Sequence, residues 1–333
     1  MKDETLVSGR SEIEAAAGRV GPYLGATPVI RSRHYSSLFS AEVFLKLEMM
    51  QPTRSFKVRG AFNSALSRSK QERSQGLMTA TGGNHGLALA YAASQLSVPA
   101  YVYVPETTSR ARQELIRDYD AEVTVHGRSW DEANKKAIQV ANEQNRVYVH
   151  PFNDRAMITG AATIFKELVE QIGRVDLVVS SIGGGGLISG ILSAVDHYSA
   201  GGASRVIGVE TLGADSMYQS VKEGRLLELP AISSIATSLG ARKPGSLTYD
   251  IVHRKVTDLV TVSDEEAVAA AFDLLEQEKL LVEPAASCCL AALTEGKIPI
   301  ERGEKVVIII CGANSSLQEL LKWGRSFNLD WAL

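Results

Sequence analysis

Residues 177–195 are LVVSSIGGGGLISGILSAV, an apolar run typical of a strand, then four glycines, then an apolar run of helical period. Glycine has no Cβ atom, so this strand-to-helix turn can point several backbone N–H groups at one anion. A flexible tight turn is the plainer alternative. It is disfavoured because consecutive glycines cost backbone entropy and supply no packing surface. The stretch therefore predicts a phosphate-binding loop.

This glycine loop matches neither of the common nucleotide-binding patterns. It lacks the G-x-x-x-x-G-K-[ST] spacing of a P-loop. It also lacks an acidic residue about 20 positions downstream, where a Rossmann dinucleotide site carries one. A Rossmann oxidoreductase is therefore the weaker interpretation.

Outward from the loop, apolar β-branched runs alternate with segments of helical period. The runs at residues 100–104, 206–209 and 306–310 are separated by helical patterns such as residues 133–141 and 265–275. This alternation predicts the α/β class, with open, mostly parallel sheets covered by helices on both faces.

The division into subdomains follows from the same alternation. Residues 76–149 contain four strand patterns and three helical ones in strict alternation, with no linker that would separate independent domains. We expect residues 76–148 to form a small mobile subdomain, inserted into a large cofactor-binding subdomain of residues 1–75 and 149–333. The cleft between the two subdomains is the expected ligand site.

Composition limits the function classes. The 333 residues are 45% hydrophobic and 22% charged, as in ordinary globular proteins. Lys and Arg total 35 against 38 Asp and Glu, a net charge of -3, which argues against nucleic acid as a partner. No apolar targeting segment or run of roughly 18 apolar residues appears, so we expect no membrane association and a cytoplasmic protein. The 3 cysteines lack metal-ligand spacing and are expected to be reduced.

Residues 51–61, QPTRSFKVRGA, contain a candidate nucleophile. If Ser55 caps the next helix, Lys57 lies in its first turn beside Phe56. The helix dipole and a partly desolvated cleft would lower the pKa of the lysine amine and make it more nucleophilic. The alternative is a solvated surface lysine among arginines such as Arg59, and spacing alone favours it.

Residues 79–86, TATGGNHG, form a second strand end, small-residue turn and helix start. Free N–H groups together with Thr81 and Asn84 would suit a carboxylate, and Asn84 could also reach a phenolic oxygen. An ordinary turn with Asn84 as helix N-cap is an equal alternative. Nothing in the pattern gives His85 a catalytic role.

In this order, the segments resemble the fold type II pyridoxal 5′-phosphate (PLP) enzymes of the serine/threonine dehydratase and serine racemase family. The similarity runs nearly end to end and extends to further motifs: KLE at 46–48, HPFND at 150–154, SLG at 238–240, LLVEPAA at 280–286 and CGAN at 311–314. The resemblance implies the tryptophan synthase β-like fold, with two interleaved, open, twisted, mostly parallel sheets flanked by helices. It also implies PLP as cofactor.

The resemblance implies roles for the matching residues. Lys57 would carry PLP as a Schiff base and act as the catalytic base, with Phe56 against the ring and Asn84 on the 3′-oxygen. Cys311 would meet the pyridine nitrogen, and because a thiol does not hold that nitrogen as a paired cation, prompt loss of a β-substituent is favoured. The implied cofactor-binding set is Phe56, Lys57, Asn84, Gly183, Gly184, Gly185, Gly186, Gly240 and Cys311. The implied substrate-binding set is Thr81, Gly83, Asn84 and His85.

The implied reaction is α,β-elimination of an L-β-hydroxy amino acid, threonine or serine or a bulkier one, to a 2-oxo acid and ammonia. Serine racemase or a β-replacement enzyme is the alternative on this fold, and a small-molecule binding protein the alternative outside catalysis. Racemisation needs a base on each face of the α-carbon, and Gly82 stands where racemases of the family carry a serine. The resemblance also implies a homodimer.

Departures from the family pattern concern the cleft entrance and a metal. Arg54 replaces the glycine common before S-F-K. A Mg²⁺ or Ca²⁺ site would use Glu210 and the Ala214 carbonyl, but Ser216 replaces the usual Asp and leaves one strong oxygen ligand. Because the chain ends at Leu333, we expect no C-terminal regulatory domain.

Overall fold

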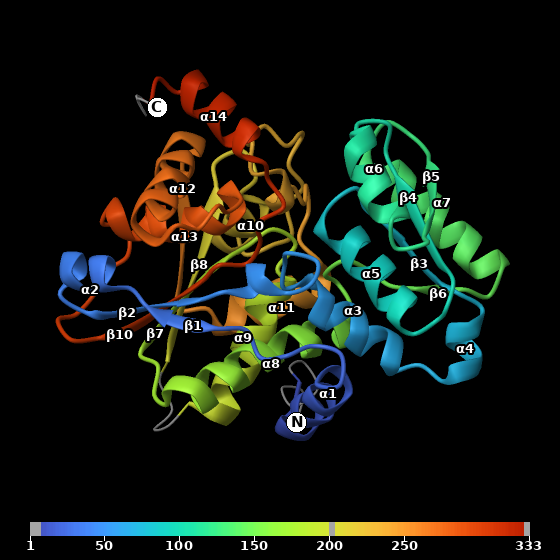
Figure 1. Cartoon of the computed structure of the whole chain (residues 1–333), viewed down its shortest axis with the longest axis horizontal. Helices are drawn as coiled ribbons and strands as arrows, with labels where there is room; N and C mark the ends of the chain where they lie inside the picture. Colours follow the sequence, from blue (N-terminus) through green and yellow to red (C-terminus); the bar gives the residue numbers. More distant parts are fainter. Residues whose placement is uncertain (1–7, 200–203, 330–333) are drawn as a thin grey trace.

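The computed structural model describes residues 8–199 and 204–329. Residues 1–7, 200–203 and 330–333 of the predicted large subdomain lie outside the described residues. The chain forms two bodies, each built on its own sheet (Figure 1). Within the described residues, no helix is both long and apolar enough to cross a membrane.

The larger body is built on a six-stranded sheet of order β1-β2-β10-β7-β8-β9. Only β1 runs antiparallel to its neighbour, and the other neighbouring strands pair in parallel. β10 lies between β2 and β7, where Val307 pairs with Phe44 on one side and Val178 on the other. The strands are β1 Val29–Arg31, β2 Glu42–Lys46, β7 Leu177–Ser181, β8 Arg205–Thr211, β9 Asp258–Val262 and β10 Lys305–Ile309.

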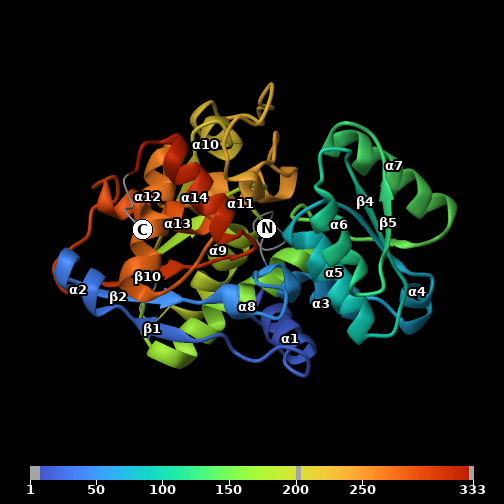
Figure 2. The same ribbon diagram turned by 45° about the horizontal axis from the view of Figure 1, so that its top comes forward.

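The smaller body has a four-stranded parallel sheet of order β5-β4-β3-β6. It lies to the right in Figures 1 and 2, in cyan to green, beside the larger body. Its strands are β3 Leu77–Ala80, β4 Ala100–Val104, β5 Glu122–Val125 and β6 Val147–Tyr148, and its helices are α4 Lys70–Ser74, α5 Asn84–Gln95, α6 Arg110–Arg117 and α7 Trp130–Glu143.

Helices cover both faces of the large sheet. α13 packs on β7, β8 and β10, while α9 packs on β7 and β8 from the opposite face (Figure 1). Burial on both faces explains why every residue of β7 is buried. The helices of this body are α1 Arg10–Val20, α2 Arg33–Phe39, α3 Lys57–Leu66, α8 Arg155–Ile172, α9 Gly186–Tyr198, α10 Ser216–Lys222, α11 Ser246–Lys255, α12 Asp264–Glu278, α13 Pro284–Thr294 and α14 Leu317–Ser326, with 3-10 turns η1 Glu48–Met50 and η2 Thr237–Leu239.

Helix α3 joins the two bodies because it packs on α8 of the larger one and α5 of the smaller one. Its approach to α8 is close at two glycines, since a Cβ on Gly160 would lie 2.6 Å from the Cα of Gly60. The predicted α/β class, with open, mostly parallel sheets flanked by helices, is confirmed. The predicted mobility of residues 76–148 stays a prediction.

Candidate active site

The segments predicted to carry chemistry meet at the carboxyl edge of the large sheet. The glycine loop follows β7 and Cys311 follows β10, while Lys57 comes after β2 by way of η1. β2, β10 and β7 are consecutive in the sheet. Ligands of open α/β sheets bind outside the carboxyl ends of the strands, so this edge is the candidate site.

Backbone pairing fixes the segment that precedes Lys57. Phe56 N–H donates to the Cys311 carbonyl over 3.0 Å, and Ser55 forms a bridge with Gly312. The prediction that Ser55 caps the helix is wrong, because α3 begins one residue later and its N-cap, Phe56, makes no side-chain cap bond. The buried Ser55 hydroxyl has no described partner. The amine-bearing segment is thus held against the strand that ends at Cys311.

The Lys57 amine is held in a neutral environment. Its Nζ donates to the Pro151 carbonyl over 2.7 Å and lies 5.1 Å from the centre of the Phe56 ring. Burial lowers the pKa of Lys57 to about 8, with a smaller opposing effect of Cys311. The amine is therefore a better nucleophile near neutral pH than an ordinary lysine, which contradicts the solvated-surface alternative.

Close packing around the loop at residues 183–186 requires glycine at several of its positions. A Cβ on Gly184 would overlap the Phe152 ring, and a Cβ on Gly183 would lie 2.9 Å from the Cα of Leu239. Gly185 has a φ of 90°, in the left-handed region, and caps the 13-residue helix α9. Because the first N–H groups of a helix have no partner inside it, this loop presents donors and a positive dipole to an anion.

Cys311 is a buried thiol at the end of β10. Its Sγ accepts a hydrogen bond from the Ser181 hydroxyl over 3.4 Å. Burial raises the pKa of the Cys311 thiol well above its usual value, and the charge of Glu283 adds to this. The thiol is therefore uncharged, which suits the predicted contact with an unpaired pyridine nitrogen.

The predicted carboxylate-binding loop lies at the start of α5. Gly83 is the N-cap and donates its N–H to the Thr81 hydroxyl over 3.2 Å, and Asn84 is the first helical residue. Asn84 is therefore not the N-cap. Burial lowers the pKa of His85 to about 3, so the ring is neutral, and its Nε2 lies 3.2 Å from the Val149 carbonyl. A carbonyl only accepts, which assigns the proton to Nε2 and leaves His85 able to donate to a carboxylate only through its backbone N–H.

Gly240 directly follows η2, and η2 ends at Leu239, which packs against Gly183. The segment at Gly240 thus lies beside the glycine loop. The structure therefore brings the predicted cofactor-binding residues to one edge of the sheet.

The predicted cation site lies at the end of β8. The buried carboxylate of Glu210 accepts the N–H groups of Met217 at 3.2 Å and Tyr218 at 2.6 Å. Burial raises the pKa of Glu210 well above its usual value. The Ser216 hydroxyl donates to the Ala241 carbonyl over 2.7 Å, and within the described residues no group of 3 or more His, Cys, Asp or Glu could hold a metal. A cation on Glu210 and the Ala214 carbonyl stays a prediction without geometric support.

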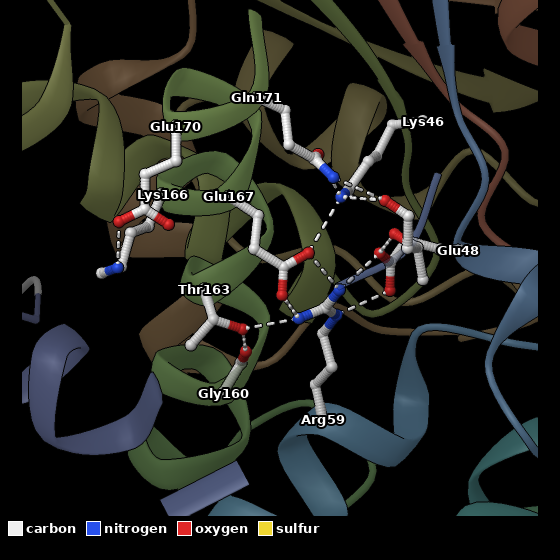
Figure 3. Close-up of polar contacts among 10 residues, drawn as sticks. Lys46, Glu48, Arg59, Gly160, Thr163, Lys166, Glu167, Glu170 and Gln171 are labelled. Atoms are coloured by element: carbon white, nitrogen blue, oxygen red, sulfur yellow. Dashed lines mark hydrogen bonds and ion pairs between the residues drawn. The ribbon is translucent and has the colours of Figure 1, made fainter. Parts of the chain in front are cut away.

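An ion-pair network beneath the site was missed, because the pattern of charges around Lys57 suggested a solvated face. Arg59 is fully buried and donates to Glu48 over 2.7 Å and to Glu167 over 2.6 Å (Figure 3). Lys46 donates to Glu167 over 2.9 Å and to Gln171 over 3.0 Å. The network ties α3, and with it Lys57, to β2 and α8. The available signal was the pair of opposite charges in KLE at residues 46–48, directly after the apolar residues of a strand.

Glu283 was also missed, although it stands in the quoted LLVEPAA motif. Its carboxylate is buried and accepts hydrogen bonds from Asn84 and from the Asn314 N–H. A lone acidic residue inside an apolar run was the signal that a buried charge lay there.

An amine suited to attack an aldehyde follows β2, and a loop suited to bind phosphate follows β7, with only β10 between the two strands. This arrangement fits a cofactor that carries both an aldehyde and a phosphate. The fold and the site thus define an enzyme of the PLP fold type II class. The family described as "Pyridoxal-phosphate dependent enzyme" matches residues 20–312, and the chain belongs to it.

Individual relatives are similar over almost the whole chain. The chain is 35% identical over 308 residues to an L-threonine ammonia-lyase of Geobacter sulfurreducens, covering 92% of this chain and 76% of that protein. It is 36% identical over 313 residues to a phenylserine dehydratase of Ralstonia pickettii, covering 94% of this chain and 95% of that protein. Among solved structures, maize serine racemase superimposes with a TM-score of 0.89 at 31% identity, covering 96% of this chain and 98% of that one.

Proposed function

We propose that this protein is a PLP-dependent ammonia-lyase that eliminates the β-hydroxyl of an L-β-hydroxy amino acid and yields a 2-oxo acid and ammonia. The observation that carries the proposal is the buried Lys57 amine between the Phe56 ring and the Pro151 carbonyl. Its segment is held against the end of β10, the strand next to the one that leads to the glycine loop. The ammonia-lyase and dehydratase relatives support the same reaction.

Bound PLP would supply the electron withdrawal that labilises the α-proton of an amino acid. The protein would supply everything else. The glycine loop would hold the phosphate, Cys311 would face the pyridine nitrogen without charging it, and Asn84 would donate to the 3′-oxygen. The N–H groups at the start of α5 would bind the substrate carboxylate. Lys57, released as a free amine, would accept the α-proton.

The test of this assignment is reductive labelling. Borohydride treatment of the PLP-loaded enzyme, followed by peptide mapping, should place the phosphopyridoxyl group on Lys57. Lys57→Ala should abolish the label and nearly all 2-oxo acid formation from L-serine and L-threonine. A label on another lysine contradicts the assignment.

Racemisation is the second candidate, because maize serine racemase has the same fold. We infer that elimination dominates, since the residue proposed to face the substrate opposite Lys57 is Gly82. Thr108 occupies the space that a side chain at position 82 would need, because a Cβ on Gly82 would overlap Thr108. Chiral chromatography of L-serine reactions decides between the two: D-serine forming as fast as pyruvate would identify a racemase.

The side chain of the substrate is a further proposal. Trp130 donates its indole N–H to the Ala80 carbonyl over 2.7 Å, which places the indole beside the Thr81 loop. Its ring is stacked on that of Phe152, with 6.3 Å between the ring centres. Aromatic rings at this position suit a phenyl group as well as a methyl group. We therefore expect both L-threonine and L-threo-3-phenylserine to be substrates, and comparing the rates of 2-oxo acid formation from the two at equal concentrations tests this. The homodimer and the cytoplasmic location stay predictions of the sequence.

A further inference from the structure

Glu283 is a buried carboxylate whose described partners are all neutral. It is 2% exposed and directly precedes α13. Its Oε1 accepts the Asn84 side-chain N–H at 2.9 Å and the Asn314 backbone N–H at 2.8 Å, and its Oε2 accepts the Ser238 hydroxyl. A buried charge held only by dipoles is costly unless those dipoles are fixed in direction. The carboxylate therefore dictates how its neighbours are oriented.

Asn84, Asn314 and Glu283 form a closed ring of hydrogen bonds. The Asn314 side-chain nitrogen donates to the Asn84 side-chain oxygen over 2.8 Å, and the same nitrogen donates to the Thr53 carbonyl over 3.0 Å. Because a backbone carbonyl only accepts, the amide of Asn314 has one possible orientation. The oxygen of Asn84 must then face Asn314, and its nitrogen must face Glu283.

We propose that Glu283 is a positioning residue that sets which end of the Asn84 amide faces the cofactor. An amide nitrogen carries two hydrogens, so one can bond Glu283 while the other is available to an oxygen anion. With the amide reversed, its carbonyl would face that anion and repel it. The inference rests on the proposed contact of Asn84 with the 3′-oxygen of PLP.

The ring also spans the two bodies. Asn84 lies in the smaller body, whereas Glu283 and Asn314 lie in the larger one. Arg112 of α6 adds a second link, since it donates to the Asn314 carbonyl over 2.6 Å. Glu283 thus orients Asn84 only while the two bodies are together, so Asn84 presents its N–H to the cofactor in this arrangement.

A double-mutant cycle read out by cofactor affinity tests the inference. The apoenzyme is titrated with PLP, and the dissociation constant is followed by absorbance at about 410–420 nm, the expected band of a bound Schiff base. Glu283→Met and Asn84→Ala should each weaken PLP binding about tenfold, and the double variant should bind no more weakly than Asn84→Ala alone. Additive losses, or no loss in Glu283→Met, would overturn the role of Glu283.

Two further variants separate orientation from charge and from misfolding. Glu283→Gln keeps an oxygen for the two N–H groups and turns its own NH₂ toward the Ser238 hydroxyl, so PLP affinity should stay within about threefold of wild type. Asn314→Ala removes the other bond that orients Asn84, and it gives the same test should Glu283→Met not fold. Glu276→Met, an exposed glutamate of α12, is the control and should bind PLP normally.

The wild-type titration distinguishes this inference from the proposed function. Absence of PLP binding to Lys57 in the wild-type protein would refute the proposed function itself. If the wild-type protein binds PLP and turns over normally but the losses of PLP affinity in Glu283→Met and Asn84→Ala are additive, only the role of Glu283 is refuted.

Discussion

At the scale of single residues, the site contains several groups whose charged forms are disfavoured by burial. Lys57 has a lowered pKa, Cys311 a raised one, and His150 one lowered to about 4, mainly by desolvation and secondarily by Lys57. Neutral His150 accepts the N–H groups of Phe152 and Asn153 at its Nδ1, so it shapes the HPFND turn.

The lowered pKa of Lys57 predicts the pH dependence of cofactor capture. Only the neutral amine attacks an aldehyde, so the rate of PLP incorporation should rise about tenfold per pH unit below pH 8 and level off above it. Stopped-flow absorbance of apoenzyme mixed with PLP measures this, with Lys57→Ala as the blank. A rate that keeps rising with pH up to about 10.4, the ordinary pKa of a lysine, would contradict the lowered pKa of Lys57.

Thr108 predicts how a racemase side chain can be introduced. Gly82→Ser alone should lose activity, because its Cβ overlaps Thr108. Gly82→Ser combined with Thr108→Gly, which also removes the Thr108 Cβ at 2.9 Å, should recover folding and form D-serine from L-serine, since a hydroxyl then has room opposite Lys57. The ratio of D-serine to pyruvate is the measurement. Equal ratios in the double variant and in Thr108→Gly alone would show that Gly82 does not face the substrate.

At the scale of elements, the position of Lys57 depends on how α3 is seated. The close approach of Gly60 to Gly160 leaves no room for a methyl group. Gly160→Ala should therefore destabilise the protein by about 1–3 kcal/mol despite the gain in helix propensity. Gly18→Ala is the matched control in α1, where nothing lies within 4 Å, and should be neutral or stabilising by about 0.5–1 kcal/mol. Denaturant unfolding that ranks the two variants alike would contradict this packing.

The ion-pair network gives α3 its second attachment. Arg59→Leu would leave the fully buried Glu48 without its cation and should cost about 3–5 kcal/mol in the free energy of unfolding. Arg110→Leu removes a pair whose arginine is 90% exposed and should cost at most about 0.5 kcal/mol. Urea denaturation compares the two, and a small loss in Arg59→Leu would mean that Glu48 is reached by water or protonated.

Local patterns predicted the elements well, and side-chain partners poorly. The strands of the smaller body were predictable because apolar β-branched runs are bounded by polar turns. The role of Ser55 was not predictable, since its backbone pairs with that of Gly312, which is distant in the chain. Glu283 and Asn84 are 199 residues apart, and no periodicity reports such a contact. The candidate site was predictable where short motifs mark it, and its supporting contacts were not.

At the scale of the whole molecule, cofactor binding should stabilise the fold, since the site joins several elements. PLP at about 100 times its dissociation constant should add about 2.7 kcal/mol and raise the melting temperature by several degrees, about 3–8 °C. Pyridoxal without phosphate is the matched control and should give a smaller shift, because the glycine loop then binds nothing. Equal shifts in differential scanning fluorimetry would mean that the loop does not hold the phosphate.

Strand β10 comes last in the chain, yet it lies between β2 and β7. During synthesis on the ribosome, β2 and β7 emerge long before the strand that pairs with both. Exposed strand edges favour association with other chains, and large parallel sheets form slowly. The four strands of the smaller sheet are contiguous in the chain, so that body can fold first. The nascent chain is therefore most vulnerable to aggregation between the emergence of β7 and that of β10.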